Sequence, residues 1–193
     1  MGTAAARIAI GLGAHVTVLD ISQARMAYLE DVFGNTIETL FSNPENIEKK
    51  VSGADLVIGA VLVPGAAAPK LVSEELVQAM KAGSVIVDVA VDQGGCIATC
   101  RATTHQEPTY VAHGVVHYCV ANMPGAVPRT STYALTNATL GYALQVANHG
   151  AEAAVRGSGH LAAGVNTWDG ACTVEAVASA VGVDFTTLDS LIH

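Results

Sequence analysis

The fold of this chain is decided by one short stretch near its start, His15-Val16-Thr17-Val18-Leu19-Asp20. Apolar and β-branched residues fill the stretch, which is typical of a strand buried on both faces of a parallel sheet. The strand ends in a carboxylate, and Ser22 is then a good N-cap for a helix that we expect to reach Phe33. A buried strand followed directly by a helix is the repeating unit of α/β folds.

The same unit recurs on both sides of this stretch. The Ala- and Ile-rich segment Thr3–Leu12 predicts a helix before it. Helices and strands alternate after it, so the sequence predicts an α/β fold of the Rossmann type, with a doubly wound parallel sheet. The expected elements are strands at Thr36–Phe41, Asp55–Ala60 and Ser84–Val89, and helices at Asn43–Lys50 and Ser73–Gly83.

The character of the sequence changes near Pro128. Two more strands are expected before it, at Thr109–Ala112 and Val115–Val120, and only helices after it. We therefore divide the chain into a dinucleotide-binding domain, residues 1–128, and C-terminal helices, residues 129–193. The expected helices are Thr132–His149, Ala151–Leu161 and Thr173–Val181.

Composition restricts the possible partners. The 193 residues are 51% hydrophobic and carry a formal net charge of -8, which disfavours binding to nucleic acid. We see no leader sequence and no apolar stretch long enough to cross a membrane, and expect a cytoplasmic protein. The four cysteines lack the paired spacing of a zinc site, so no metal is expected, and Cys119 fits the core.

Two residues near the start suit a dinucleotide. Asp20 follows the strand at the point where a carboxylate can accept hydrogen bonds from the adenosine ribose and repel a 2′-phosphate, which favours NAD. Asp20 equally suits a strand-end residue that caps the helix near Ser22, and its position alone does not choose. Gly2, eighteen residues earlier, stands where the third glycine of a dinucleotide fingerprint would be.

Two later segments suit the other end of such a ligand. Asp92 follows the strand Ser84–Val89 and precedes two glycines, where a carboxylate can orient a substrate or transfer a proton. An ordinary turn residue is the alternative there. Asn122-Met123-Pro124 closes the last strand, and its amide could bond a carboxamide, although a plain strand-ending turn is also possible.

Several long runs resemble the alanine dehydrogenase family, over essentially the whole chain. One related family, the α part of nicotinamide nucleotide transhydrogenase, shares the Pro-Gly loop but not usually the Asp-Gln-Gly-Gly or Ala-Asn-Met-Pro forms. The runs are Ala60–Gly65, Ala68–Val72, Val87–Cys96, Tyr118–Pro124 and Ser131–Thr139.

The resemblance implies NAD as cofactor and a set of residues that hold it. Asp92 matches the family's active-site aspartate, beside the nicotinamide. The reaction implied is the oxidation of alanine by NAD to pyruvate and ammonium, in a homohexamer. The cofactor-binding residues implied, with Gly2 from the fingerprint, are Asp20, Arg25, Ser42, Val61, Leu62, Val89, Ala90, Val91, Asp92, Arg101, Val120, Ala121, Asn122 and Met123.

The resemblance also implies that the chain is a fragment. The family carries its substrate-holding arginine and lysine and its catalytic histidine in an N-terminal domain, ahead of the first strand of the sheet, and we find neither here. We therefore expect the chain alone to be inactive as a dehydrogenase. The alternatives are a non-catalytic dinucleotide-binding module, one half of a split dehydrogenase, or a piece that joins the oligomer.

Overall fold

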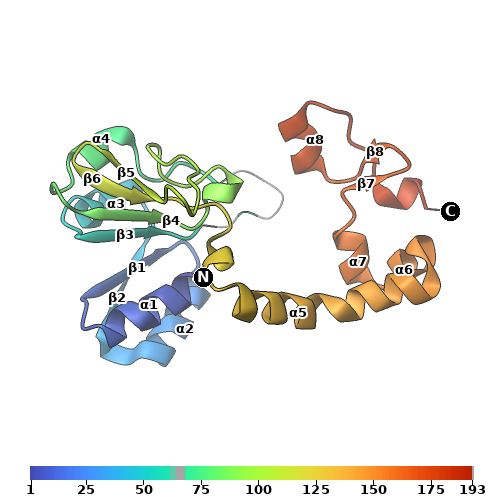
Figure 1. Cartoon of the computed structure of the whole chain (residues 1–193), viewed down its shortest axis with the longest axis horizontal. Helices are drawn as coiled ribbons and strands as arrows, with labels where there is room; N and C mark the ends of the chain where they lie inside the picture. Colours follow the sequence, from blue (N-terminus) through green and yellow to red (C-terminus); the bar gives the residue numbers. More distant parts are fainter. Residues whose placement is uncertain (62, 64–67, 193) are drawn as a thin grey trace. The chain divides into compact units, whose positions relative to one another are not determined.

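The computed structural model describes residues 1–61, 63 and 68–192. These residues form two compact units, which divide between Met123 and Pro124 (Figure 1). The sequence placed the division slightly later, after residue 128. Each unit is described separately.

The first unit alternates helices and strands in the predicted order. Three short elements are 3-10 turns: η1 (Gly34–Thr36), η2 (Val91–Gln93) and η3 (Met123–Ala126), the last spanning the division. The helices and strands are α1 (Gly2–Gly11), β1 (Val16–Asp20), α2 (Gln23–Phe33), β2 (Ile37–Phe41), α3 (Pro44–Val51), β3 (Leu56–Gly59), α4 (Glu74–Gln78), β4 (Val85–Asp88), β5 (Thr109–Ala112) and β6 (Val115–Tyr118).

These strands form two sheets whose carboxyl ends carry the predicted site. β1 and β2 pair in parallel, with Asp20 opposite Phe41. The second sheet has the order β3-β4-β6-β5, in which the first three strands are parallel (Figure 1). β5 is antiparallel to β6 and joined to it by His113-Gly114, both at positive φ (54° and 77°), as a two-residue hairpin turn requires. The predicted Rossmann-type α/β fold is confirmed.

Two of the strand edges that lack a partner among the described residues belong to β1 and β3. β1 pairs only with β2, and β3 pairs only with β4. In the order 3-2-1-4-5-6 of such folds, these are the edges on either side of the first strand. Helix α1 contacts both β1 and β3, so it links the two sheets.

The core of the first unit lies where α3 and α4 cover the four-stranded sheet. Val77 of α4, Ile86 of β4, Ile97 and Val115 of β6 are all fully buried. Their side chains come from segments far apart in the sequence, so burial of this apolar surface holds the strands in register.

The predicted N-cap Ser22 is confirmed, and Asn43 and Ser73, which begin two of the expected helices, are N-caps as well. Ser22, Asn43 and Ser73 each accept a hydrogen bond from a backbone N–H in the first turn of the helix that follows. The predicted end of the fourth helix, near Gly83, is wrong, because α4 ends at Gln78. The segment beyond it forms a turn in which the Gly83 N–H bonds the Gly114 carbonyl, so a tertiary contact replaces further helical turns.

The second unit is mostly helical, as predicted, but differs in detail. Its elements are α5 (Pro128–His149), α6 (Ala151–Gly157), α7 (Gly159–Ala163), β7 (Thr167–Trp168), β8 (Ala171–Cys172), α8 (Glu175–Val181) and η4 (Leu188–Ser190). α5 begins four residues before the predicted Thr132, because Pro128 suits the first turn of a helix. None of its residues is buried, and no helix of the described residues could cross a membrane.

Two features of this unit were not predicted. The expected helix Ala151–Leu161 is two helices, because Ser158 is extended and caps α7 by accepting from the Leu161 N–H. Asp169-Gly170, both at positive φ, joins β7 to β8 as a hairpin, and such Asp-Gly pairs are a recognised hairpin signal.

Candidate functional site

Asp20 lies at the carboxyl end of β1, and one of its two carboxylate oxygens already accepts a hydrogen bond. Its Oδ1 accepts the Ser22 N–H at 2.9 Å, in the turn just before α2, whose N-cap is Ser22 itself. Among the described residues, Oδ2 has no hydrogen-bond partner and remains available to a ligand. Ser42, which follows β2, lies beside it, because the Ser42 N–H bonds the Asp20 carbonyl at 3.0 Å.

Arg25 and Gly2 join Asp20 at the start of α1. The Arg25 guanidinium donates to Thr3 Oγ1, which fastens α2 to the first turn of α1. A Cβ placed on Gly2 would lie 3.7 Å from Ala60 Cβ, an ordinary van der Waals distance, so Gly2 lies close to the end of β3. The cluster therefore combines a carboxylate, a guanidinium and the positive end of a helix dipole. Thr3 was not predicted, and nothing in the sequence marked it.

The two residues expected to follow β3 are only partly described. Val61 is half-buried and packs against the core. Leu62 lies outside the described residues, so its predicted cofactor contact stays a prediction.

Beyond β4, the chain turns so that Asp92 is exposed while Ala90 and Val91, just before it, are buried. Ala90 is 4% exposed and Val91 is 8% exposed, so they can meet a ligand only through backbone atoms or small patches of side chain. Val89 is half-buried. Asp92 lies in η2, and its Oδ2 accepts the Asn122 N–H at 3.3 Å. The structure thus brings together two segments that the sequence selected separately.

The segment Val120–Met123 is held in place from its other side. Thr103 bridges Val120 in parallel, and its carbonyl accepts the Ala121 N–H at 3.0 Å. Asn122 has φ 56°, a left-handed conformation that asparagine adopts more readily than most residues. This backbone leaves Asn122 exposed and Met123 half-buried at the same edge of the sheet as Asp92.

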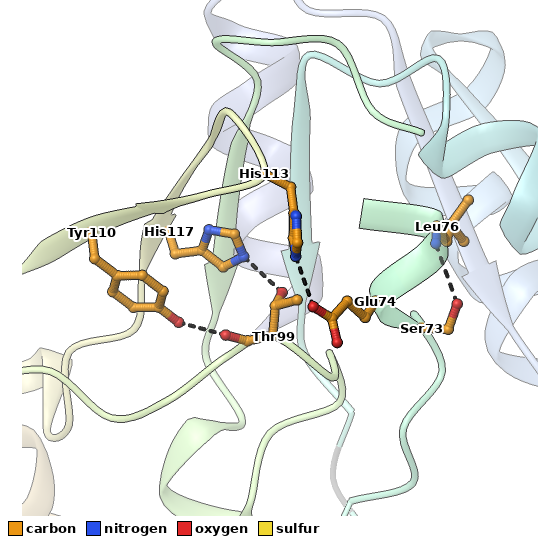
Figure 2. A network of polar contacts seen from close by, with 7 residues as sticks. All are labelled: Ser73, Glu74, Leu76, Thr99, Tyr110, His113 and His117. Carbon is orange, nitrogen blue, oxygen red and sulfur yellow. Dashed lines mark hydrogen bonds and ion pairs between the residues drawn. The ribbon is translucent and has the colours of Figure 1, made fainter. Parts of the chain in front are cut away.

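Arg101 is held by a polar network that the sequence did not predict. Its backbone N–H donates to Tyr110 Oη at 3.0 Å, and its guanidinium lies 4.2 Å from the centre of the Tyr110 ring. Tyr110 in turn donates to the Thr99 carbonyl at 2.8 Å (Figure 2). Burial raises the pKa of Tyr110 to about 12, so its hydroxyl stays protonated and able to donate.

His117 anchors the other side of this network. Burial lowers its pKa, which favours the neutral ring. Nδ1 lies 3.0 Å from the Val115 carbonyl, which can only accept, so Nδ1 carries the proton and Nε2 accepts from Thr99 Oγ1 at 2.8 Å (Figure 2). His117 is therefore a buried histidine with both ring nitrogens hydrogen-bonded, and it holds Thr99 in position.

His113 has a different role from His117. It lies in the β5–β6 turn, and its Nε2 is 2.8 Å from Glu74 Oε1 at the start of α4 (Figure 2). This hydrogen bond connects the hairpin to α4.

The thiols of Cys100 and Cys119 belong to the residues just before Arg101 and Val120. A hydrogen bond between Cys100 and Cys119 raises the pKa of Cys100 and lowers that of Cys119, so Cys119 loses its proton more readily. Cys119 is fully buried, as predicted. Neither thiol is in a disulfide.

The site therefore consists of two groups of residues at carboxyl ends of parallel strands, where ligands of α/β sheets bind. The first group, around Asp20, has the chemistry to hold a ribose and a phosphate. The second, around Asp92 and Asn122, offers a carboxylate and amides to a polar ring substituent.

Comparisons with known proteins show the family to which the chain belongs. Residues 1–175 match the family model described as alanine dehydrogenase/PNT, C-terminal domain. The alanine dehydrogenase of Lysinibacillus sphaericus is 59% identical over 187 residues, which are 96% of this chain and 50% of that protein.

Solved structures give the same result. A structure of L-alanine dehydrogenase matches with a TM-score of 0.82 and 52% identity, over 94% of this chain and 50% of that one. A transhydrogenase from Sinorhizobium meliloti matches with a TM-score of 0.56 and 29% identity, over 65% of this chain and 35% of that one. The chain spans about half the length of the curated relatives it matches.

Proposed function

Because the chain belongs to the alanine dehydrogenase/PNT C-terminal domain family, we propose that its first unit binds NAD(H) for the dehydrogenation of alanine. The observation that carries the proposal is the cluster at the start of α1, where Asp20 keeps one carboxylate oxygen without a partner among the described residues. Such an oxygen suits the adenosine ribose, and a 2′-phosphate beside it would be repelled.

The residues fit the parts of the cofactor in order. The first turn of α1, with Gly2 close to Ala60, suits the pyrophosphate, because the N–H groups there point away from the helix. Ser42 lies beside Asp20, and Arg25 lies in the first turn of α2, where its N–H bonds Ser22; both suit the ribose. Asp92 and the segment Val120–Met123 suit the nicotinamide end.

The reaction we propose is the reversible conversion of alanine to pyruvate and ammonium. The bound nicotinamide would supply hydride transfer. Asp92 is exposed beside that end of the site, where its carboxylate can hold a cationic amine or move a proton to or from it. The similarity to alanine dehydrogenases supports this substrate. The homohexamer and the cytoplasmic location implied by the resemblance stay predictions.

Titration of the purified chain with NADH, followed by NADH fluorescence, tests the proposal. We expect saturable binding that Asp20→Ala weakens about tenfold, a loss of about 1.4 kcal/mol. NADPH should bind less tightly, and Asp20→Asn should narrow the difference between the two cofactors. Asp31→Ala, which removes an exposed carboxylate from α2, is the matched control.

Two results would refute the proposal. One is a folded chain that binds no NADH. The other is equal weakening by Asp20→Ala and Asp31→Ala, which would mean that only the net charge matters.

A further inference from the structure

Asp88 is a buried carboxylate to which neither the sequence nor the resemblance gave a role. It is the last residue of β4 and has no exposed surface. A charge buried in this way is strongly unfavourable unless hydrogen bonds compensate it. The contacts of Asp88 therefore indicate what the group is for.

All the backbone N–H groups that donate to the Asp88 carboxylate belong to one loop. Oδ1 accepts the Ala90 N–H at 2.9 Å, and Oδ2 accepts the N–H groups of Cys96 at 2.9 Å and Ile97 at 3.3 Å. Ala90 begins the loop and Ile97 ends it, so one carboxylate ties both ends together. We call residues 90–97 the Asp92 loop.

A cation holds the carbonyl groups of the same loop. Lys70 Nζ donates to the Gly94 carbonyl at 2.5 Å and to the Ile97 carbonyl at 3.3 Å. The backbone N–H of Leu71 donates to the Cys96 carbonyl at 2.8 Å. The Asp92 loop is thus fixed through its N–H groups by Asp88 and through its carbonyls by the segment at Lys70.

Two glycines make room for the carboxylate. A Cβ on Gly59 would lie 3.1 Å from Asp88 Oδ1, and a Cβ on Gly95 would lie 2.6 Å from Oδ2. Gly95 also has φ 69°, which strains any other residue. Gly59 on β3 and Gly95 in the loop therefore both leave space for the carboxyl group of Asp88 at the end of β4.

Asp92 is exposed on the loop that this arrangement holds in place. It lies between the tied ends, in η2, and its Oδ2 accepts the Asn122 N–H from a segment that Asp88 does not touch. We propose that Asp88 is a positioning residue, which holds Asp92 against Asn122 at the nicotinamide end of the site. The inference rests on the proposed function for the identity of the ligand, but not for the contact between Asp92 and Asn122.

The first test needs no ligand. In the isotope-labelled chain, Asp88→Asn places an amide group opposite backbone N–H groups and loosens the loop. We expect the amide NMR signal of Asn122 to move in the direction in which Asp92→Asn moves it. Ser84→Ala is the matched control, because Ser84 is buried at the other end of β4, where its hydroxyl bonds the Ala54 carbonyl. It should leave the Asn122 signal in place.

The second test separates positioning from general stability. ADP-ribose lacks the nicotinamide, so Asp88→Asn should weaken NADH binding about tenfold, as a loss of about 1.4 kcal/mol does, and leave ADP-ribose binding within about twofold. If Asp88→Asn does not fold, both tests are made with Lys70→Met, because Lys70 is largely exposed and donates a hydrogen bond to the same loop.

Each outcome decides one question. An unchanged Asn122 signal in the folded variant would overturn the inference, and so would equal weakening of NADH and ADP-ribose. A wild-type chain that binds neither ligand would refute the proposed function, and the Asn122 signal alone would then decide the role of Asp88.

Discussion

Gly59→Ala is expected to destabilise the first unit through one contact. The added Cβ would lie 2.6 Å from Cys96 Sγ, and Cys96 is only 3% exposed, so the sulfur has no solvent to move into. Overpacking of this kind costs about 1–3 kcal/mol. Alanine also restricts the backbone of the unfolded chain more than glycine does, which offsets about 0.4–1 kcal/mol of this cost. We therefore expect a net loss of about 1–2 kcal/mol.

The same contact predicts a partial rescue. Cys96→Ala removes the sulfur, after which the tightest contacts given for the new Cβ are with the Asp88 carboxyl group, Oδ1 at 3.1 Å and Cγ at 3.3 Å. In that background, Gly59→Ala should cost less than about 0.5 kcal/mol, so the two substitutions should couple by about 1 kcal/mol. Gly53→Ala is the control, because its Cβ would meet nothing nearer than the Lys49 carbonyl at 4.0 Å.

Urea unfolding followed by far-UV circular dichroism measures these free energies. The one tryptophan, Trp168, lies in the second unit, so its fluorescence would report the wrong part of the chain. Equal costs of Gly59→Ala with and without Cys96 would refute the packing argument. A stable Gly59→Ala variant would show that the strand end accommodates a methyl group.

Three further predictions concern the network around β6 and a helix start. The unfolding free energy should fall as the pH drops below about 6.5. Below that pH His117 takes up a proton in the unfolded chain, whereas the buried ring, with its lowered pKa, stays neutral. His117→Gln should flatten this pH dependence in urea titrations at several pH values. Tyr110→Phe leaves the Arg101 N–H without its acceptor and should cost about 1 kcal/mol by the same assay. Asn43→Ala removes the acceptor of the Asn46 N–H and should lower thermal stability by about 1 kcal/mol, read by calorimetry.

The local parts of the fold were predictable because their signals are local. The strand ending at Asp20 and the caps Ser22 and Asn43 depend on neighbours a few residues away, and the structure has them where the sequence predicts. The early end of α4 at Gln78 depends instead on Gly114, which is distant in the sequence. No local pattern could reveal that contact.

The candidate site divides in the same way. Asp92 and Asn122 each follow a strand, and the rule that ligands bind at carboxyl ends was enough to select them. Tyr110 and Asp88 act through contacts with a loop, and their surroundings in the sequence are those of ordinary strand residues. Their roles become visible only when the loop is seen folded against them.

The turn between β5 and β6 has a consequence for how the sheet is assembled. The hairpin closes through two residues, His113 and Gly114, whereas the parallel pairing of β3 with β4 must first close residues 60–84 into a loop. Closing a longer loop costs more chain entropy, and hairpins form within microseconds. We therefore expect the antiparallel edge to nucleate the sheet, with the parallel strands joining it in reverse of their order along the chain. The residues that hold Arg101 would then be in place before the strand that ends at Asp88 has found its neighbours.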